Sequence, residues 1–276
     1  MSNLRIIHAN YADQATSLAA STTSGSLAAS YVQTDLKGQA HRSTTTFVSY
    51  TLKWSGGVTL GGIALPATNL TAAAVIRVRL YSDVALTTVI ADTGVITACP
   101  GLTAAPWTWT ATRNVNGFAY GVLSKAVAWF SQNYSGVKGC FIEIDDPTNP
   151  AGYIDCARLV AGPWWAPEWN AEYGVTTQVV DNSANARNDA GDLITDRAPM
   201  HEEMTLKLPW LGEADRSQLV QMMRANGVWR PVFLSLFPAD GGAAEQDHMI
   251  FGKRKPAPIE HPFFATYAST LEMEGW

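Results

Sequence analysis

The sequence predicts a mainly β protein with two antiparallel β-sandwich domains, the second of which carries one flanking α-helix. Segments rich in aromatic and β-branched residues recur along the chain, and several of them alternate apolar and polar residues. Clusters of Gly, Pro, Asn and Asp separate these segments. Only one segment has the start and stop signals of a helix. A chain of 276 residues is long enough for one large or two modest domains.

The first part of the chain predicts loops followed by short strands. Residues 10–46 are rich in Ala, Ser and Thr, so we interpret them as an extended arm or long loops lying over a sheet. Residues 47–54, 58–60 and 63–66 predict three short strands separated by glycine pairs. Residues 75–81 alternate between apolar and polar side chains, which is typical of a half-buried strand.

Further strands follow before the domain boundary. Residues 89–96 predict a strand pair or a bulged strand, and residues 99–120 a long structured excursion with exposed aromatic residues. Residues 126–130 predict another strand. Residues 139–145 and 153–160 flank a turn rich in Asp, Asn and Pro, so we expect them to pair as an antiparallel hairpin.

A proline-bounded connector at residues 161–167 predicts the boundary between the domains. We therefore expect a first domain over residues 1–162, a β-sandwich or jelly roll, and a second over residues 163–276.

The second domain contains the one predicted helix, Glu213–Asn226. Acidic residues lie in its first turn and Arg224 in its last, which suits the helix dipole, and Gly227 suits the position after its end. A polar, turn-rich segment at residues 181–198 precedes it. The strands predicted around the helix are residues 203–208, 228–237, 249–252 and 263–273, with a loop at residues 238–247.

The charge balance excludes several classes of protein. Only 16% of residues are charged, and 19 basic against 24 acidic residues give a net charge of −5. A nucleic-acid-binding protein would have a basic surface, and a protein of anionic membranes would have a polybasic cluster. The sequence shows no signal peptide and no membrane-spanning run, so we expect assembly in a cytoplasm, no membrane insertion and no nucleic-acid partner.

The chemically reactive residues predict no active site and no cofactor. The five histidines are scattered, and the three cysteines lack metal or redox spacing, so we interpret the cysteines as buried thiols. Glu143, Asp145, Asp146 and Asp155 surround the predicted hairpin turn. We interpret them as turn residues, with a calcium site in the 145–150 turn and acid–base catalysis left as alternatives.

Tryptophans are the most conspicuous candidates for a functional surface. Five of them fall in segments predicted to be irregular, and they are Trp107, Trp109, Trp164, Trp165 and Trp169. Such residues anchor subunit interfaces or fill the space between domains, belong to the hydrophobic core of a domain, or stack on sugar rings. All of these alternatives remain open.

Three segments together resemble structural proteins from the tail tip of long-tailed, Mu-like bacteriophages. The first is residues 63–83, and the second runs through residues 142–154 and 157–170. The third is the late succession of strand, helix Glu213–Asn226, strand and closing strand. The first domain is similar to galactose-binding-like β-sandwiches, and the second is similar to the small β-sandwich with a helix found in tail-tube and distal-tail proteins.

The resemblance implies a virion protein without catalytic residues. It implies a ring, commonly a homohexamer, that links the tail tube to the baseplate hub and tail fibres. Distal-tail proteins often place the ring-forming domain first, whereas this chain places it second, so a peripheral baseplate position remains an alternative. A different class of function, a carbohydrate-binding module for attachment to the host surface, also remains open.

Overall fold

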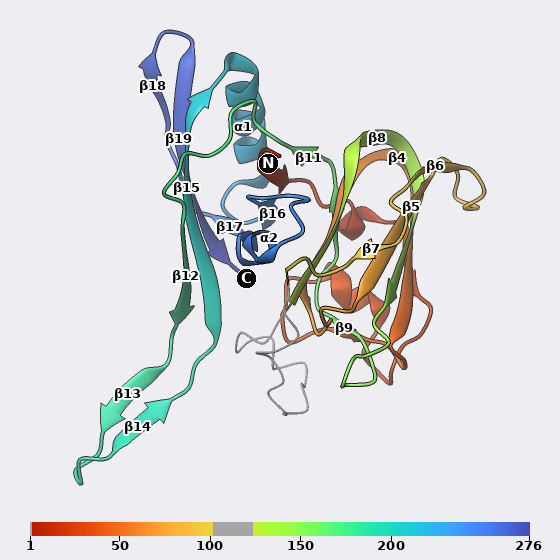
Figure 1. Ribbon diagram of the computed structural model, residues 1–276, viewed down its shortest axis with the longest axis horizontal. Helices are drawn as coiled ribbons and strands as arrows, with labels where there is room; N and C mark the ends of the chain where they lie inside the picture. The colour runs from red at the N-terminus through yellow and green to blue at the C-terminus, as the bar shows by residue number, and fades with distance from the viewer. Residues whose placement is uncertain (1, 102–123) are drawn as a thin grey trace.

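The computed structural model describes residues 2–101 and 124–276, and it confirms a mainly β fold built from antiparallel sheets. Two bodies lie side by side (Figure 1). One is a β-sandwich built around two very long strands, and the other is a twisted sheet with a helix against it. Within the described residues, no helix combines the length and apolar character needed to cross a membrane.

The sandwich is built on the strands β4 (Phe47–Thr68) and β8 (Ser124–Asp145). They pair antiparallel along their whole length, so that Val48 lies opposite Ile144 at one end and Thr68 opposite Ser124 at the other. Both strands bend midway, and one hydrophobic core contains side chains from both halves of each. The predicted strands at 47–54, 58–60 and 63–66 are therefore parts of one strand.

Glycines at the bend explain why the strands can turn together. A Cβ atom on Gly57 would lie 3.0 Å from the Cα of Gly136, and Gly136 has a φ of +73°. Here the two backbones approach closely, and only glycine adopts that φ readily. The glycine pairs that resembled strand breaks in the sequence thus mark a bend within the strands.

Short strands extend both layers of the sandwich. β5 (Val75–Tyr81) pairs with one half of β8. The edges carry β2 (Ser17–Ala20), β3 (His41–Arg42), β6 (Val89–Asp92), β7 (Ile96–Thr97), β9 (Asp155–Cys156) and β10 (Val160–Gly162). The 3₁₀ helices η1 (Ala12–Gln14) and η2 (Ala29–Gln33) lie in the Ala/Ser/Thr-rich segment, where β2 adds to the edge of β4.

The second body contains a sheet in the order β11-β1-β16-β17-β19-β15-β12, with β18 paired to β19. Its strands are β1 (Arg5–Ile7), β11 (Trp164–Trp165), β12 (Thr176–Asp181), β15 (Met200–Leu211), β16 (Val232–Ser235), β17 (Met249–Arg254), β18 (Ile259–Phe263) and β19 (Thr266–Gly275). Helix α1 has the predicted bounds, Glu213–Asn226, and buries Leu219 and Met222 in the core of this sheet.

The first strand of the chain lies in the second sheet. β1 pairs with β16 and, on its other side, with β11, where Ile6 lies opposite Trp165. The division into domains at residues 1–162 and 163–276 stays a prediction. The strand pairing shows in addition that Arg5–Ile7 belongs to the same sheet as the strands that follow residue 163.

Two local predictions are wrong. Residues 139–145 do not pair with residues 153–160, because β8 has β4 on one side and β5 on the other. The later segment instead forms β9 and β10, which both pair with β4. The predicted loop at residues 238–247 contains a short helix, α2 (Ala243–Asp247).

Candidate functional site

The tryptophans selected from the sequence lie in different surroundings. Trp107 and Trp109 fall outside the described residues. Trp164 and Trp165 form β11 and are half-buried, and Trp165 packs on the core of the second sheet. Trp169 is 60% exposed, which makes it the most accessible of the three described ones. Their roles as interface or glycan contacts stay predictions.

Arg5 joins the two bodies between two tryptophans. Its guanidinium group lies 4.2 Å from the ring centre of Trp164 and 5.4 Å from that of Trp129. Trp129 comes from β8 and Arg5 from β1, so this stack spans the sandwich and the second sheet. Burial lowers the pKa of Arg5. Since Trp164 is engaged here, it offers little free surface to a ligand.

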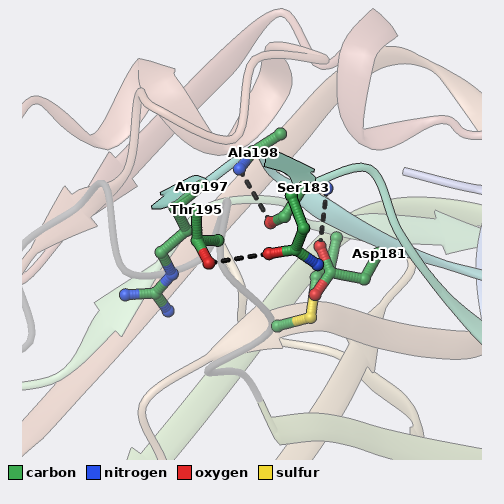
Figure 2. Close-up of a pocket in the computed structure, with 7 residues that line it drawn as sticks. Asp181, Ser183, Thr195, Arg197 and Ala198 are labelled. Atoms are coloured by element: carbon green, nitrogen blue, oxygen red, sulfur yellow. Dashed lines mark hydrogen bonds between the residues drawn. The ribbon is translucent and has the colours of Figure 1, made fainter. Parts of the chain in front are cut away.

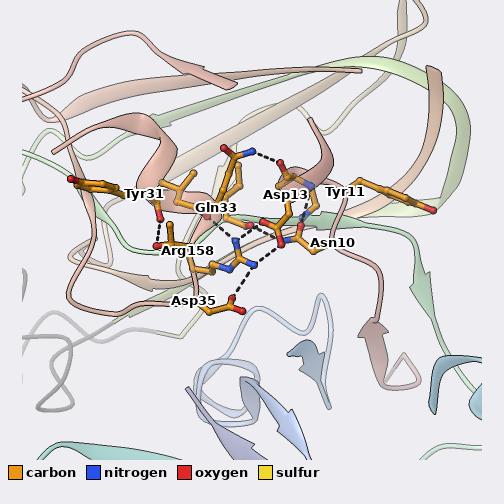
Figure 3. Close-up of polar contacts among 12 residues, drawn as sticks. Asn10, Tyr11, Asp13, Tyr31, Gln33, Asp35 and Arg158 are labelled. Carbon is orange, nitrogen blue, oxygen red and sulfur yellow. Dashed lines mark hydrogen bonds and ion pairs between the residues drawn. The ribbon is translucent and has the colours of Figure 1, made fainter. Parts of the chain in front are cut away.

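A second joint is centred on the buried side chain of Arg158 (Figure 3). Its guanidinium donates to both carboxylate oxygens of Asp13, at 2.5 and 2.7 Å, and lies 3.0 Å from Asp35. The backbone oxygen of Asp35 accepts a hydrogen bond of 2.6 Å from the indole of Trp276. The network therefore ties the loops of the sandwich to the end of β19 and has a structural role.

Two of the four acidic residues around the predicted turn, Asp146 and Asp155, are also engaged in polar contacts. Asp146 is fully buried and accepts hydrogen bonds from Asn149 and from the backbone N–H and hydroxyl of Thr71. Asp155 is held by Arg42 at 2.8 Å. Among the described residues, no group of three or more His, Cys, Asp or Glu side chains is placed to hold a metal ion.

The most distinctive surface is an arm, which we define as residues 179–202, the part of the ribbon that extends beyond the pairing of β15 with β19 at Glu203. β12 pairs with β15 from Thr176 to Asp181, and the ribbon then continues as β13 (Ala184–Arg187) and β14 (Leu193–Asp196). Figure 1 shows this ribbon extending away from both bodies. Every residue of β13 and β14 is exposed, including Leu193 and Ile194 at 60% and 56%.

A hollow of about 490 Å³ lies where the arm changes from β12 and β15 to its two-stranded end (Figure 2). Its wall combines polar and apolar atoms, and Asp181, Arg197 and Met200 are among the residues that line it. Hydrogen bonds from Ser183 lower the pKa of Asp181, so this carboxylate stays ionised. The sequence of this segment is polar and rich in turn residues, and it contains few large apolar residues, so the sequence alone does not indicate a site here.

Comparisons with known proteins give little beyond partial similarity of fold. No protein-family model and no curated protein matches the chain. A fucose-binding module of Streptococcus pneumoniae matches with 8% identity and a TM-score of 0.37, covering 56% of this chain and 95% of that one. A family 32 carbohydrate-binding module of C. perfringens, solved with galactose, matches with 10% identity and a TM-score of 0.37, over 58% and 99%.

A chitosan-binding module of a Paenibacillus sp. chitosanase/glucanase matches with 15% identity and a TM-score of 0.37, covering 56% of this chain and 98% of that one. These scores are low, and the fold assignment rests on the strand pairing given above. None of the comparisons tests the resemblance to phage tail-tip proteins, which stays a prediction.

Proposed function

We propose that this chain is a structural subunit of a phage tail tip, where it forms or joins the ring that links the tail tube to the baseplate hub and fibres. The observation that carries this proposal is the arm. A two-stranded ribbon is marginally stable in water by itself, yet here it extends from the protein with both faces exposed. Docking on a neighbour in an assembly would cover it.

Other exposed apolar residues support an assembly role. Phe263 and Phe264, at the turn between β18 and β19, are 65% and 97% exposed, and Trp210 at the end of β15 is 54% exposed. Large aromatic residues are enriched at subunit interfaces, and charged residues are depleted at interface cores. A chain with only 16% charged residues suits such a surface. The partners we propose are further copies in a homohexamer, the tail tube protein, the hub and the fibre proteins, in a virion assembled in the host cytoplasm.

The test is the mass of the purified protein, followed by imaging of any oligomer. We expect a defined ring from the unmodified chain. A variant in which a two-residue turn replaces residues 184–196 should keep its thermal unfolding midpoint and lose the ring. A chain that stays monomeric alone and with tail tube protein would contradict the proposal, as would a ring that forms equally well without the arm end.

Carbohydrate binding is the second candidate, and the exposure of Trp169 favours it. Tyr173, four residues later, is 99% exposed, so two aromatic rings of one segment are accessible. A glycan array probed with the unmodified chain and with Trp169→Ala tests this candidate. Trp229→Ala is the matched control, because Trp229 is 63% exposed but lies elsewhere. Binding lost only in Trp169→Ala would support it, and no glycan bound by the unmodified chain would reject it.

A further inference from the structure

We propose that the end of the arm of one copy docks on a platform formed by Trp229 and Arg230 of a second copy. This inference rests on the proposed function, because it names the surface that receives the arm within an assembly. Three observations support this inference. The two surfaces have opposite charge, both expose apolar side chains, and they lie too far apart in one copy to contact each other.

The arm end is acidic and partly apolar. Residues 181–197 contain four aspartates against two arginines, which gives this stretch a net charge of −2. Leu193 and Ile194 lie opposite Arg187 and Ala186 in the ribbon, so one large apolar side chain is exposed on each of its faces. A partner for this end would therefore combine basic groups with apolar surface.

The platform lies just after α1 and has the complementary character. The guanidinium of Arg230 lies 4.4 Å from the ring centre of Trp229. Arg224 is exposed in the last turn of α1, and residues 221–231 contain two arginines and no acidic residue. Arg254 donates to the backbone oxygen of Met223, which adds a further positive charge at this end of the helix.

Trp229 is exposed, and one edge of its ring lies against the end of α1. Its ring lies against Gly227, where a Cβ atom would be 2.9 Å from the Cδ1 atom of Trp229. Gly227 ends α1 with a φ of +55°, a conformation that favours glycine. A larger residue at this position would also collide with the ring of Trp229. A 63% exposed tryptophan beside an arginine has the composition of an interface hot spot.

The two surfaces cannot meet within one chain. In Figure 1 the arm end lies at one extreme of the molecule, while α1 lies beside the opposite part of the same sheet. A contact between them joins two copies through different surfaces, and a repeated contact of this kind closes into a ring or continues as a filament. Opposite charge would also orient the copies as they approach.

Charge reversal tests the pairing. One variant carries Arg224→Glu and Arg230→Glu, and a second carries Asp189→Arg and Asp196→Arg. Each alone should weaken self-association by about tenfold or more, because like charges then face each other. Mixing the two variants should restore association, since each contact becomes complementary again. Lys53→Glu with Lys138→Glu, on the sandwich, is the matched control and should associate like the unmodified chain.

A cross-linking experiment tests proximity without altering charge. The three native cysteines are buried, so single cysteines introduced at exposed alanines can be oxidised selectively. Mixing Ala190→Cys, at the arm end, with Ala225→Cys, beside the platform, should give a disulfide-linked dimer. Ala73→Cys, exposed on the sandwich, should give none with either.

The outcomes separate this inference from the proposed function. Association that is unchanged by both charge reversals, together with no cross-link, overturns the docking surface and leaves the ring subunit in place. An unmodified chain that does not associate, together with an Ala190→Cys and Ala225→Cys mixture that gives no cross-link, overturns both. If a charge-reversal variant fails to fold by circular dichroism, the cross-link decides.

Discussion

The guanidinium group of Arg158 binds both carboxylate oxygens of Asp13, a residue 145 positions earlier in the sequence. The arginine is 2% exposed, and it also donates to the backbone oxygen of Val32. Removing one member of such a buried, hydrogen-bonded ion pair lowers the stability of the fold, because the groups that remain lose their hydrogen-bond partners.

We therefore predict that Arg158→Met lowers the free energy of unfolding by about 3 kcal/mol. Urea denaturation followed by tryptophan fluorescence measures it. Arg77→Met is the matched control, because Arg77 also binds an aspartate through two nitrogens, but on the exposed surface. That control should change stability little, and equal losses in the two variants would contradict the structural role of Arg158.

A second prediction concerns stability at mildly acidic pH. Burial lowers the pKa of His41 and of His8 below the ordinary value of 6.5. The unfolded chain then binds protons more readily than the folded one. The contribution of these two histidines to the free energy of unfolding is therefore fully present above pH 6.5 and falls as the pH drops below that value. The ring nitrogens of His41 lie 2.8 Å from the hydroxyl of Tyr50 and 2.9 Å from the backbone oxygen of Thr22, and the burial of this ring is what opposes its protonation.

Urea unfolding at a series of pH values from 8 to 5 measures this fall. The double variant His8→Gln with His41→Gln should show a flatter profile than the unmodified chain over the same range. A profile for the unmodified chain that rises toward pH 5 would contradict the assignment.

Thiol reactivity gives a third prediction. Burial raises the pKa of Cys99 and Cys156 to about 12, and Cys140 is shifted in the same direction. Since the thiolate is the reactive form, the folded protein should not react with a disulfide reagent at pH 8 within minutes. After unfolding, all three cysteines should react. A thiol that reacts rapidly in the folded protein would show that one of these sites is open to solvent.

The joint between the two bodies gives a fourth prediction. A Cβ atom on Gly62 would lie 2.6 Å from the ring of Trp129 and 2.9 Å from Ile7 of β1. Gly62→Ala should therefore cost about 1–3 kcal/mol of unfolding free energy through overpacking. Gly56→Ala, on the same strand with open space around it, is the control and should be nearly neutral. Thermal unfolding of both variants compares them.

The local features of the fold could be predicted from the sequence, and the long-range ones could not. Helix Glu213–Asn226 was predictable because its charged ends and terminal glycine act within a few residues. The predicted pairing of residues 139–145 with residues 153–160 is wrong, because a turn-rich segment between two strands favours the strand nearest in sequence as the partner. The actual partners of β8 are set by a core that combines residues from distant segments.

The candidate surfaces were predictable only in part. Tryptophans could be selected by type, but their exposure depends on tertiary neighbours such as Arg5 beside Trp164. The arm was visible as a polar, turn-rich segment, yet its extension away from the protein follows from β12 and β15 continuing beyond the edge of the sheet. Trp229 gave no signal, because it lies within a segment predicted to be a strand.

The pairing of β1 with β11 brings together the two ends of the segment that forms the sandwich. Ile7 and Trp164 are neighbours across these two antiparallel strands, so the chain leaves the second sheet and returns to it at one place. The whole sandwich is therefore a cassette held by adjacent ends, the arrangement in which one module can be exchanged for another with least disturbance to its host. A short turn from residue 8 to residue 163 would close the sheet without it, and a different module could occupy the same place while the sheet, α1 and the arm stay unchanged.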